Sequence, residues 1–169
     1  MRLVVSNTGP LMHLSQAQSL DLLRLLGEIH IPPAVATEAA RHISAWATAP
    51  PAWINITPLQ PAHASQAQAW EKAGLLDWGE AEALALTRQL NADWFLTDDT
   101  AARVLTASLG IEVHGSLGVV LWAAATGHLN RSEAEAALNG LAASTLWLSA
   151  RVLQEAKEAL DRIFPVSNS

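Results

Sequence analysis

Six polar side chains, in four separate segments of the chain, could form one metal site. All carry carboxylate or carboxamide oxygens and lie at an expected strand end or on an expected helix: Asn7, Glu38, Glu80, Glu82, Asp98 and Asp99. Hard oxygen ligands of this kind suit magnesium, which keeps several waters and needs few direct protein contacts. One or two such cations can activate water and stabilise the charge that builds up when a phosphodiester is hydrolysed. The sequence therefore predicts an acidic site for a divalent cation.

Local geometry separates the members of each close pair. Glu80 and Glu82 are two residues apart on an expected helix, about 200° around its axis, so they cannot both face one ion. Glu80 is the better ligand because it lies nearer the start of that helix. The direction of the preceding strand favours Asp98. Asp99 could add a ligand, cap the next helix or pair with Arg103.

Each of these residues also has a purely structural interpretation. Asn7 precedes a helix start that contains a proline, where asparagine is a common cap. Glu80, Asp98 and Asp99 fit the first turn of a helix, where the helix dipole favours acids. Glu38 could lie on a solvated helix face. It is the joint placement of these residues that favours a metal site.

Alternating strands and helices are expected to position the site. Short apolar runs predict strands at residues 2–6, 29–31, 53–56, 94–97 and 111–113. Helical patterns start at Pro10 and cover residues 19–26, 32–42, 64–74, 79–90 and 102–109. This alternation predicts an α/β protein with three α/β/α layers and a central parallel sheet. From residue 117 onward the chain is expected to be mainly helical, with a short extended piece at 146–148.

Length and composition narrow the class of protein. The chain has 169 residues, half of them apolar, no cysteine and a formal net charge of -6. This size predicts one domain at residues 1–164, followed by a tail at 165–169 that is expected to fray. No apolar run approaches the roughly 20 residues of a membrane span, and no secretory signal is found, so we expect a soluble cytoplasmic protein. The negative charge argues against a protein that coats nucleic acids.

Histidines and tryptophans give weaker signals. The six histidines show no compact ligand spacing and are expected to be structural or exposed, although His114 ends an expected strand. The seven tryptophans form no stripe at helical spacing, and only Trp78, beside Glu80, is a candidate for stacking on a base.

Five motifs, in order along the chain, resemble those of a known family. They are residues 4–11 (VVSNTGPL), 31–35 (IPPAV) with Glu38, 79–83 (GEAEA), 96–99 (LTDD) with Arg103, and 115–119 (GSLGV). Over roughly residues 3–129 they resemble the PIN-domain ribonucleases, in the branch related to VapC-type toxins. The resemblance implies a PIN-like domain that binds Mg²⁺ or Mn²⁺ and cuts RNA. It also implies a small antitoxin partner and a homodimer.

The resemblance places four residues at the acidic positions of the family. These are Asn7, Glu38, Glu80 and Asp98, in that order. Asn7 departs from the pattern, because active members typically carry aspartate there. Its amide can supply an oxygen but no charge, so we expect the metal to bind more weakly.

Four further residues are candidates for substrate binding. Arg41 or Arg103 could contact a phosphate. Thr8 and Ser116 could contact a phosphate or a metal-bound water, although Ser116 also fits a helix N-cap.

Two functions from different classes follow. The first is a metal-dependent ribonuclease of the toxin type, with three carboxylates holding the metal and Asn7 as a neutral ligand. The second is a PIN-like protein that has lost catalysis and acts by binding other proteins, which the amide of Asn7 favours. A nucleotide-binding, flavodoxin-like domain is a weaker third hypothesis, because no glycine-rich phosphate loop follows the first strand.

Overall fold

Five parallel strands form the sheet at the centre of the molecule. The computed structural model describes residues 1–166, and the strands lie in the order β3-β2-β1-β4-β5. Their bounds are β1 Leu3–Ser6, β2 Glu28–Ile31, β3 Ile54–Ile56, β4 Trp94–Leu96 and β5 Glu112–His114. Val4 and Val5, which point to opposite faces of β1, are both fully buried. The central strand is therefore covered on both sides, as in other parallel sheets.

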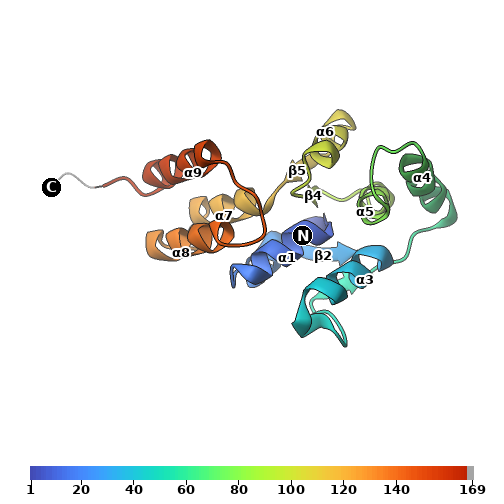
Figure 1. Ribbon diagram of the computed structural model, residues 1–169, viewed down its shortest axis with the longest axis horizontal. Coiled ribbons are helices and arrows are strands. Elements are labelled where there is room, and N and C mark those ends of the chain that lie inside the picture. Colours follow the sequence, from blue (N-terminus) through green and yellow to red (C-terminus); the bar gives the residue numbers. More distant parts are fainter. Residues whose placement is uncertain (167–169) are drawn as a thin grey trace.

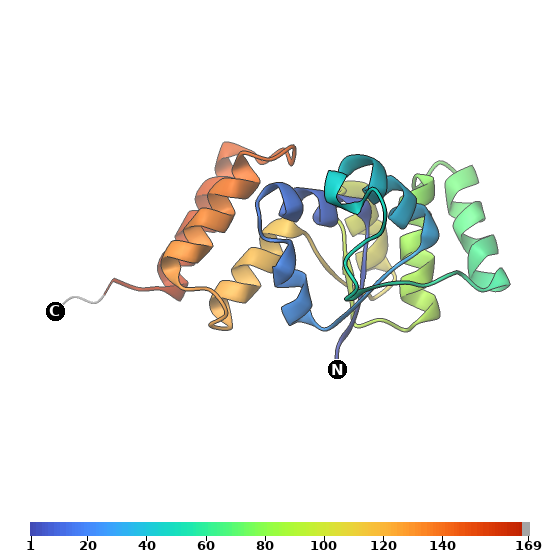
Figure 2. The same ribbon diagram turned by 90° about the horizontal axis from the view of Figure 1, so that it is seen from below.

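Helices complete the three-layer α/β/α arrangement that the sequence predicts (Figure 1). In chain order the helices are α1 Thr8–Gln16, the 3₁₀ turn η1 Leu20–Leu22, α2 Leu23–Leu26, α3 Pro33–His42, the 3₁₀ turn η2 Ser44–Trp46, α4 Pro61–Lys72, α5 Trp78–Gln89, α6 Thr100–Ser108, α7 Ser116–Ala125, α8 Arg131–Ala142 and α9 Ala150–Ile163. Helices α4 and α5 pack together at one end of the molecule, and α7, α8 and α9 pack together at the other (Figures 1 and 2). The mainly helical C-terminal part is thus confirmed.

The strand order changes direction at β1, and this change places the site. After β1 the chain moves outward to β2 and β3, then crosses to the other side of β1 to form β4 and β5. Ser6 pairs with Leu96, and the Asn7 N–H donates to the Leu96 carbonyl at 2.9 Å. Ligands of open α/β sheets bind outside the carboxyl ends of the strands at such a reversal. The residues that follow β1 and β4 therefore share one crevice.

Several helix and strand ends shift by one to three residues from the sequence-based expectation, and three further differences have a local explanation or change an element. Helix α1 begins at Thr8 rather than Pro10, because Asn7 already has the extended backbone of an N-cap residue. Residues 19–26 form a 3₁₀ turn and a single α-helical turn, because the chain must then run against β1 at Gly27. A Cβ at Gly27 would lie 2.2 Å from the carbonyl oxygen of Arg2, and its φ of +148° also requires glycine. Residues 146–148 form a connection without strand structure.

Among the helices of residues 1–166, none combines the length and the apolar character needed to cross a bilayer. Of the expected tail, Pro165 and Val166 carry no secondary structure, and residues 167–169 lie outside the described residues.

Candidate active site

A cavity of about 310 Å³ lies at the carboxyl ends of β1 and β4. We call it the acidic pocket, because five carboxylates and one carboxamide are among its lining residues: Asn7, Glu38, Asp77, Glu80, Asp98 and Asp99. The four residues that the sequence places at the acidic positions thus line one cavity, although they come from four separate segments. Thr8, His13, His42 and Trp147 are further members of the lining.

Asn7 occupies the N-cap position of α1 without acting as a cap. In the described structure its side chain makes no cap hydrogen bond to α1. Instead, its Nδ2 donates to Thr97 Oγ1 at 3.4 Å, and the residue is only 6% exposed. The Asn7 side chain therefore does not cap α1, and its hydrogen bond instead connects the residues that follow β1 and β4.

Glu38 is held against the start of α5. The Thr8 hydroxyl donates a hydrogen bond to Glu38 Oε2 at 2.6 Å, which holds the carboxylate next to the first residue of α1. A Cβ added to Gly79 would lie 2.5 and 2.7 Å from the two carboxylate oxygens of Glu38. A glycine at position 79 is therefore required for Glu38 to take this place.

Glu80 belongs to a capping box at the same helix end. Its N–H donates to Asp77 Oδ1 at 2.9 Å, and its Oε2 accepts from the Asp77 N–H at 3.2 Å. Burial raises the pKa of the Glu80 carboxyl from 4.5 to about 7, and the charges of Asp77, Asp99 and Glu38 act in the same direction. Glu80 is thus both a helix cap and a carboxylate in an acidic surrounding that disfavours its charge.

Asp98 is the most firmly held carboxylate of the pocket. Its Oδ1 accepts the Ser116 N–H at 2.7 Å, and its Oδ2 accepts the Ser116 hydroxyl at 2.6 Å. The Oδ2 also lies 2.7 Å from His13 Nδ1. Gly115 permits this approach, since its Cβ would lie 2.8 Å from Asp98 Oδ1. A carboxylate has about four lone-pair sites, so one site on Oδ1 remains for a further ligand.

The two neighbouring acids each accept a hydrogen bond from a helix N-terminus. Glu82 is buried on the other side of α5, where its Oε1 accepts the Ala34 N–H at 3.4 Å, and burial raises its pKa. Asp99 caps α6 by accepting the Ala102 N–H at 2.7 Å, although its side chain also lines the acidic pocket. Within residues 1–166, Asp99 caps α6 and forms no ion pair with Arg103, and its role as a metal ligand stays a prediction.

The substrate-binding candidates lie in different places. Thr8 lines the pocket through its contact with Glu38, and Arg103 lies just beside it, with Nη1 3.0 Å from the Cβ position of Gly115. Ser116 is the first residue of α7, which is preceded by Gly115 as the cap, so the expected Ser116 N-cap is wrong. Arg41 lies on another side of α3, in a separate hollow beside Trp46. The structure does not bring Arg41 to the acidic pocket.

Sequence reasoning missed four lining residues of the pocket that carry a titratable or aromatic side chain. Asp77 could have been found, because Asp77-x-x-Glu80 is the spacing of a capping box. His13, His42 and Trp147 reach the pocket only through tertiary packing. His114, the histidine singled out from the sequence, instead pairs with Glu112 and packs on Trp94. Trp78 is not among the lining residues.

The donor set of the pocket fits a hard divalent cation in ligand type and charge. Five carboxylates line it, and its lining includes no lysine or arginine. The carboxylates of Glu38, Glu80 and Asp98 each accept a hydrogen bond from a neighbouring residue. In their present positions, no three acidic or histidine side chains of residues 1–166 are close enough together to bind one ion. Unpaired carboxylates repel one another, so side chains must rotate towards one another to share a cation.

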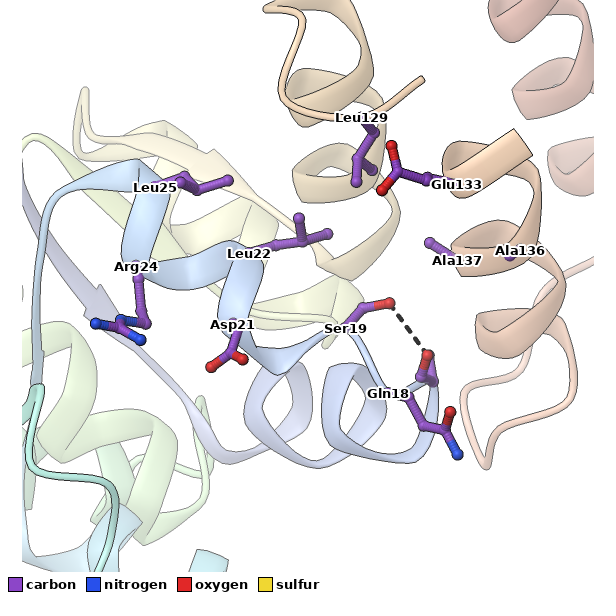
Figure 3. A pocket seen from close by; sticks show the side chains of 11 residues that line it. Gln18, Ser19, Asp21, Leu22, Arg24, Leu25, Leu129, Glu133, Ala136 and Ala137 are labelled. Carbon is purple, nitrogen blue, oxygen red and sulfur yellow. Dashed lines mark hydrogen bonds between the residues drawn. The ribbon is translucent and has the colours of Figure 1, made fainter. Parts of the chain in front are cut away.

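A larger cavity, of about 810 Å³, lies on another part of the surface between η1, α2 and α8 (Figure 3). Leu22 points across it towards Ala137, and the Ser19 hydroxyl donates to the Ala17 carbonyl at 3.1 Å. Its charged residues, Asp21, Arg24 and Glu133, do not form a cluster of acids. Chemistry rather than size therefore selects the smaller, acidic pocket as the candidate site.

A family model, DUF3368, described as a PIN domain, matches residues 3–162. The chain belongs to the PIN-domain family. No curated protein matches the chain in a sequence search. A PIN domain is a nuclease fold.

The raised pKa of Glu80 predicts a pH dependence with a defined sign. Between pH 4.5 and about 7 the folded PIN domain keeps a proton on Glu80 that the unfolded chain has lost, so this group lowers the free energy of unfolding as pH rises. Glu80→Gln keeps the capping geometry without the charge, and its stability relative to wild type should therefore increase from pH 4.5 to 7. Urea denaturation at several pH values measures this difference.

Glu133→Gln is the matched control, because Glu133 forms the same capping box at the start of α8. Its stability relative to wild type should not follow the same rise. A difference between Glu80→Gln and wild type that stays constant with pH would contradict the assignment.

Gly79→Ala should separate the site from the fold. The new methyl group must displace the Glu38 carboxylate, which is the end of a flexible side chain, so the structural cost is low. Alanine is the better helix former by up to about 1 kcal/mol. We expect a melting temperature equal to or above that of wild type, together with weaker Mn²⁺ binding in a calorimetric titration. Gly118→Ala is the control, since its Cβ would meet only His114 at 3.7 Å and lies outside the pocket.

Proposed function

We propose that this PIN domain is a Mg²⁺- or Mn²⁺-dependent endoribonuclease of the toxin-antitoxin, VapC-like type. The observation that carries the proposal is the convergence of Asn7, Glu38, Glu80 and Asp98 on one pocket at the strand-order reversal. A pocket with this excess of negative charge repels phosphate unless a cation is present. Metal dependence therefore follows from the charge of the pocket.

The residues divide into ligands and supports. Glu38, Glu80 and Asp98 would hold the cation, with the Asn7 carboxamide as a neutral ligand. The bound ion would activate water and stabilise the charge on the phosphate oxygens. Thr8 orients Glu38 through its 2.6 Å hydrogen bond, and Ser116 orients Asp98. These two hydrogen bonds orient the carboxylates, as residues that contact metal ligands generally do.

Two residues would act on the substrate or on the orientation of a ligand. Arg103 carries a permanent positive charge beside Asp98 and would contact a phosphate of the RNA backbone. His13 lies 2.7 Å from Asp98 Oδ2 and would hold that carboxylate in one rotamer. Oδ2 of Asp98 is then engaged by Ser116 and His13, and Oδ1, which accepts one hydrogen bond, would bind the cation.

The test is a metal titration combined with an RNA cleavage assay. Calorimetry should detect Mn²⁺ binding to the wild-type protein, and cleavage of single-stranded RNA should require Mg²⁺ or Mn²⁺ and stop when EDTA is added. Mn²⁺ binding without RNA cleavage would exclude the ribonuclease activity but support the metal site. The absence of both would exclude the proposal.

Cellular context and assembly are part of the same proposal. A chain without cysteine suits a reducing compartment, and we place the protein in the cytoplasm with a small antitoxin and a second copy of the chain as partners. Light scattering after size-exclusion chromatography tests the homodimer, which should have twice the monomer mass.

A catalytically inactive PIN domain that binds proteins is the second candidate. Two observations favour it: Asn7 supplies no charge, and the carboxylates of Asp98 and Glu80 accept hydrogen bonds from backbone N–H groups at helix starts. This candidate predicts no Mn²⁺-dependent shift in melting temperature. Melting curves of the wild-type protein recorded with and without Mn²⁺ therefore distinguish the two candidates.

A further inference from the structure

Trp147 is the most exposed of the seven tryptophans, all of which lie in the described residues. It is 83% exposed, compared with 42% for Trp78, the next most exposed. An indole in water forgoes the large burial energy that tryptophan normally contributes to a fold. The exposed position of Trp147 is therefore unexplained by the stability of the domain.

The connection that carries Trp147 is held in place. It joins α8 to α9 and curves back towards α1 (Figure 1). Gln16 Oε1, at the end of α1, accepts hydrogen bonds from the N–H and the hydroxyl of Thr145, each at 2.9 Å. Leu146 and Leu148, on either side of Trp147, pack against the hydrophobic core. The indole is thus presented outward by an anchored segment.

Trp147 stands between two hollows. The first is the acidic pocket, and the second is an adjoining hollow of about 240 Å³. Asp98, Leu146 and Trp147 line both of them. Among the described residues that line either hollow, Arg103 alone is a lysine or arginine, and it lies in the second.

This arrangement combines the two elements that bind a single-stranded nucleic acid. Proteins of this kind place a cationic group on the backbone and an aromatic ring on which an unpaired base stacks. Bases in a duplex already stack on one another, so their faces cannot reach an indole. A single nucleic-acid strand that runs from the second hollow to the acidic pocket would pass Arg103 first and Trp147 next.

We infer that Trp147 is the base-stacking residue for single-stranded RNA, with Arg103 on an adjacent phosphate and the scissile phosphodiester in the acidic pocket. This inference rests on the proposed ribonuclease function. It assigns to Trp147 the selection of unpaired over paired RNA. The exposed Trp78 has no such role, because it lies outside both hollows.

The test compares Trp147→Ala, Trp147→Phe and the matched control Trp78→Ala in the full chain. The affinity of each variant is measured for a fluorescently labelled single-stranded RNA, for a duplex of the same sequence and for an abasic strand of the same length. Ca²⁺ replaces Mg²⁺ so that the RNA stays intact. Trp147→Ala should weaken binding of the single strand by about 5- to 150-fold. Trp147→Phe should retain most of the affinity, and Trp78→Ala should bind as wild type does.

The abasic strand isolates stacking from a general disturbance of the loop. Wild type and Trp147→Ala should bind it equally weakly, because it offers no base. Tryptophan fluorescence provides a second readout: the quenching that single-stranded RNA causes in wild type should be reduced in Trp147→Phe. Equal affinity of Trp147→Ala and wild type for the single strand, or an equal loss for the abasic strand, would overturn the inference.

The failure of this inference differs from the failure of the ribonuclease. Mg²⁺-dependent cleavage by wild type, with unchanged binding by Trp147→Ala, would overturn stacking and support the ribonuclease. Binding that depends on Trp147, without cleavage, would support stacking and overturn the ribonuclease. If Trp147→Ala instead disrupts self-association and leaves RNA binding unchanged, the indole serves a protein interface and the inference is wrong.

Discussion

Replacing Asp98 with asparagine should lower RNA cleavage by at least about 100-fold and also destabilise the fold. Loss of an outer partner of a metal site commonly costs 10- to 100-fold in affinity or activity, and loss of a charged ligand should cost no less. The carboxylate also accepts hydrogen bonds from the Ser116 N–H and hydroxyl at 2.7 and 2.6 Å. Asparagine keeps the shape but loses the charge that strengthens these bonds, which should lower the free energy of unfolding by about 1–2 kcal/mol. Urea denaturation and a cleavage assay measure the two effects.

The control for Asp98→Asn lies at the opposite end of β4. Asp93 Oδ2 accepts the Leu3 N–H at 2.7 Å, so Asp93→Asn also removes a carboxylate that binds a backbone amide. This variant should lose some stability and keep full cleavage. If Asp98→Asn loses stability but cleaves RNA as well as Asp93→Asn does, Asp98 is a structural ligand of α7 and not a metal ligand.

The fold could be predicted from the sequence because local signals agree with burial. The apolar run that contains Val4 and Val5 is the fully buried central strand, and Pro33 opens α3 where its missing N–H costs little. Parallel strands then bring their carboxyl ends to one edge, so residues after β1 and β4 had to become neighbours. The short α2 could not be predicted, because the close approach of Gly27 to Arg2 is a tertiary contact.

The candidate site could be predicted only as far as strand ends and helix starts determine position. This explains why Asn7 and Asp98 line one pocket, while their role as metal ligands stays a prediction. The contact of His13 with Asp98 joins residues 85 positions apart, and no spacing in the sequence reveals it. Trp147 reaches the pocket because Thr145, two residues before it, donates two hydrogen bonds to Gln16 in α1, which lies 129 positions away in the sequence.

The polar contacts of the pocket determine how each acid affects the stability of the fold. A cluster of carboxylates without a cation should repel, which favours neutral replacements. This argument holds for Glu80, whose pKa is raised to about 7. It fails for Asp98, because donors from Ser116 compensate its charge. The two acids are therefore expected to respond in opposite directions when each is replaced by its amide.

Replacing Asn7 with aspartate should tighten divalent-metal binding by at least about 10-fold and raise RNA cleavage. At an effective dielectric constant of about 20, opposite unit charges about 4 Å apart attract by about 4 kcal/mol, and even the part that remains after desolvation exceeds the 1.4 kcal/mol of a tenfold change. The fold can accept the substitution. Asn7 Nδ2 now donates to Thr97 Oγ1, and the rotatable Thr97 hydroxyl can donate to an aspartate oxygen at the same place.

Two measurements test Asn7→Asp, and a matched variant controls for added charge. Without metal the new carboxylate adds to the repulsion among Glu38, Glu80 and its neighbours, so the variant should melt below wild type and show a larger rise in melting temperature with Mg²⁺. Calorimetric titration with Mn²⁺ gives the affinity directly. Asn139→Asp adds the same charge on the exposed surface of α8 and should change neither the Mn²⁺ affinity nor the rise in melting temperature with Mg²⁺. If Asn7→Asp and Asn139→Asp bind Mn²⁺ equally, position 7 is not a metal ligand, and the protein-binding candidate becomes the better account of this PIN domain.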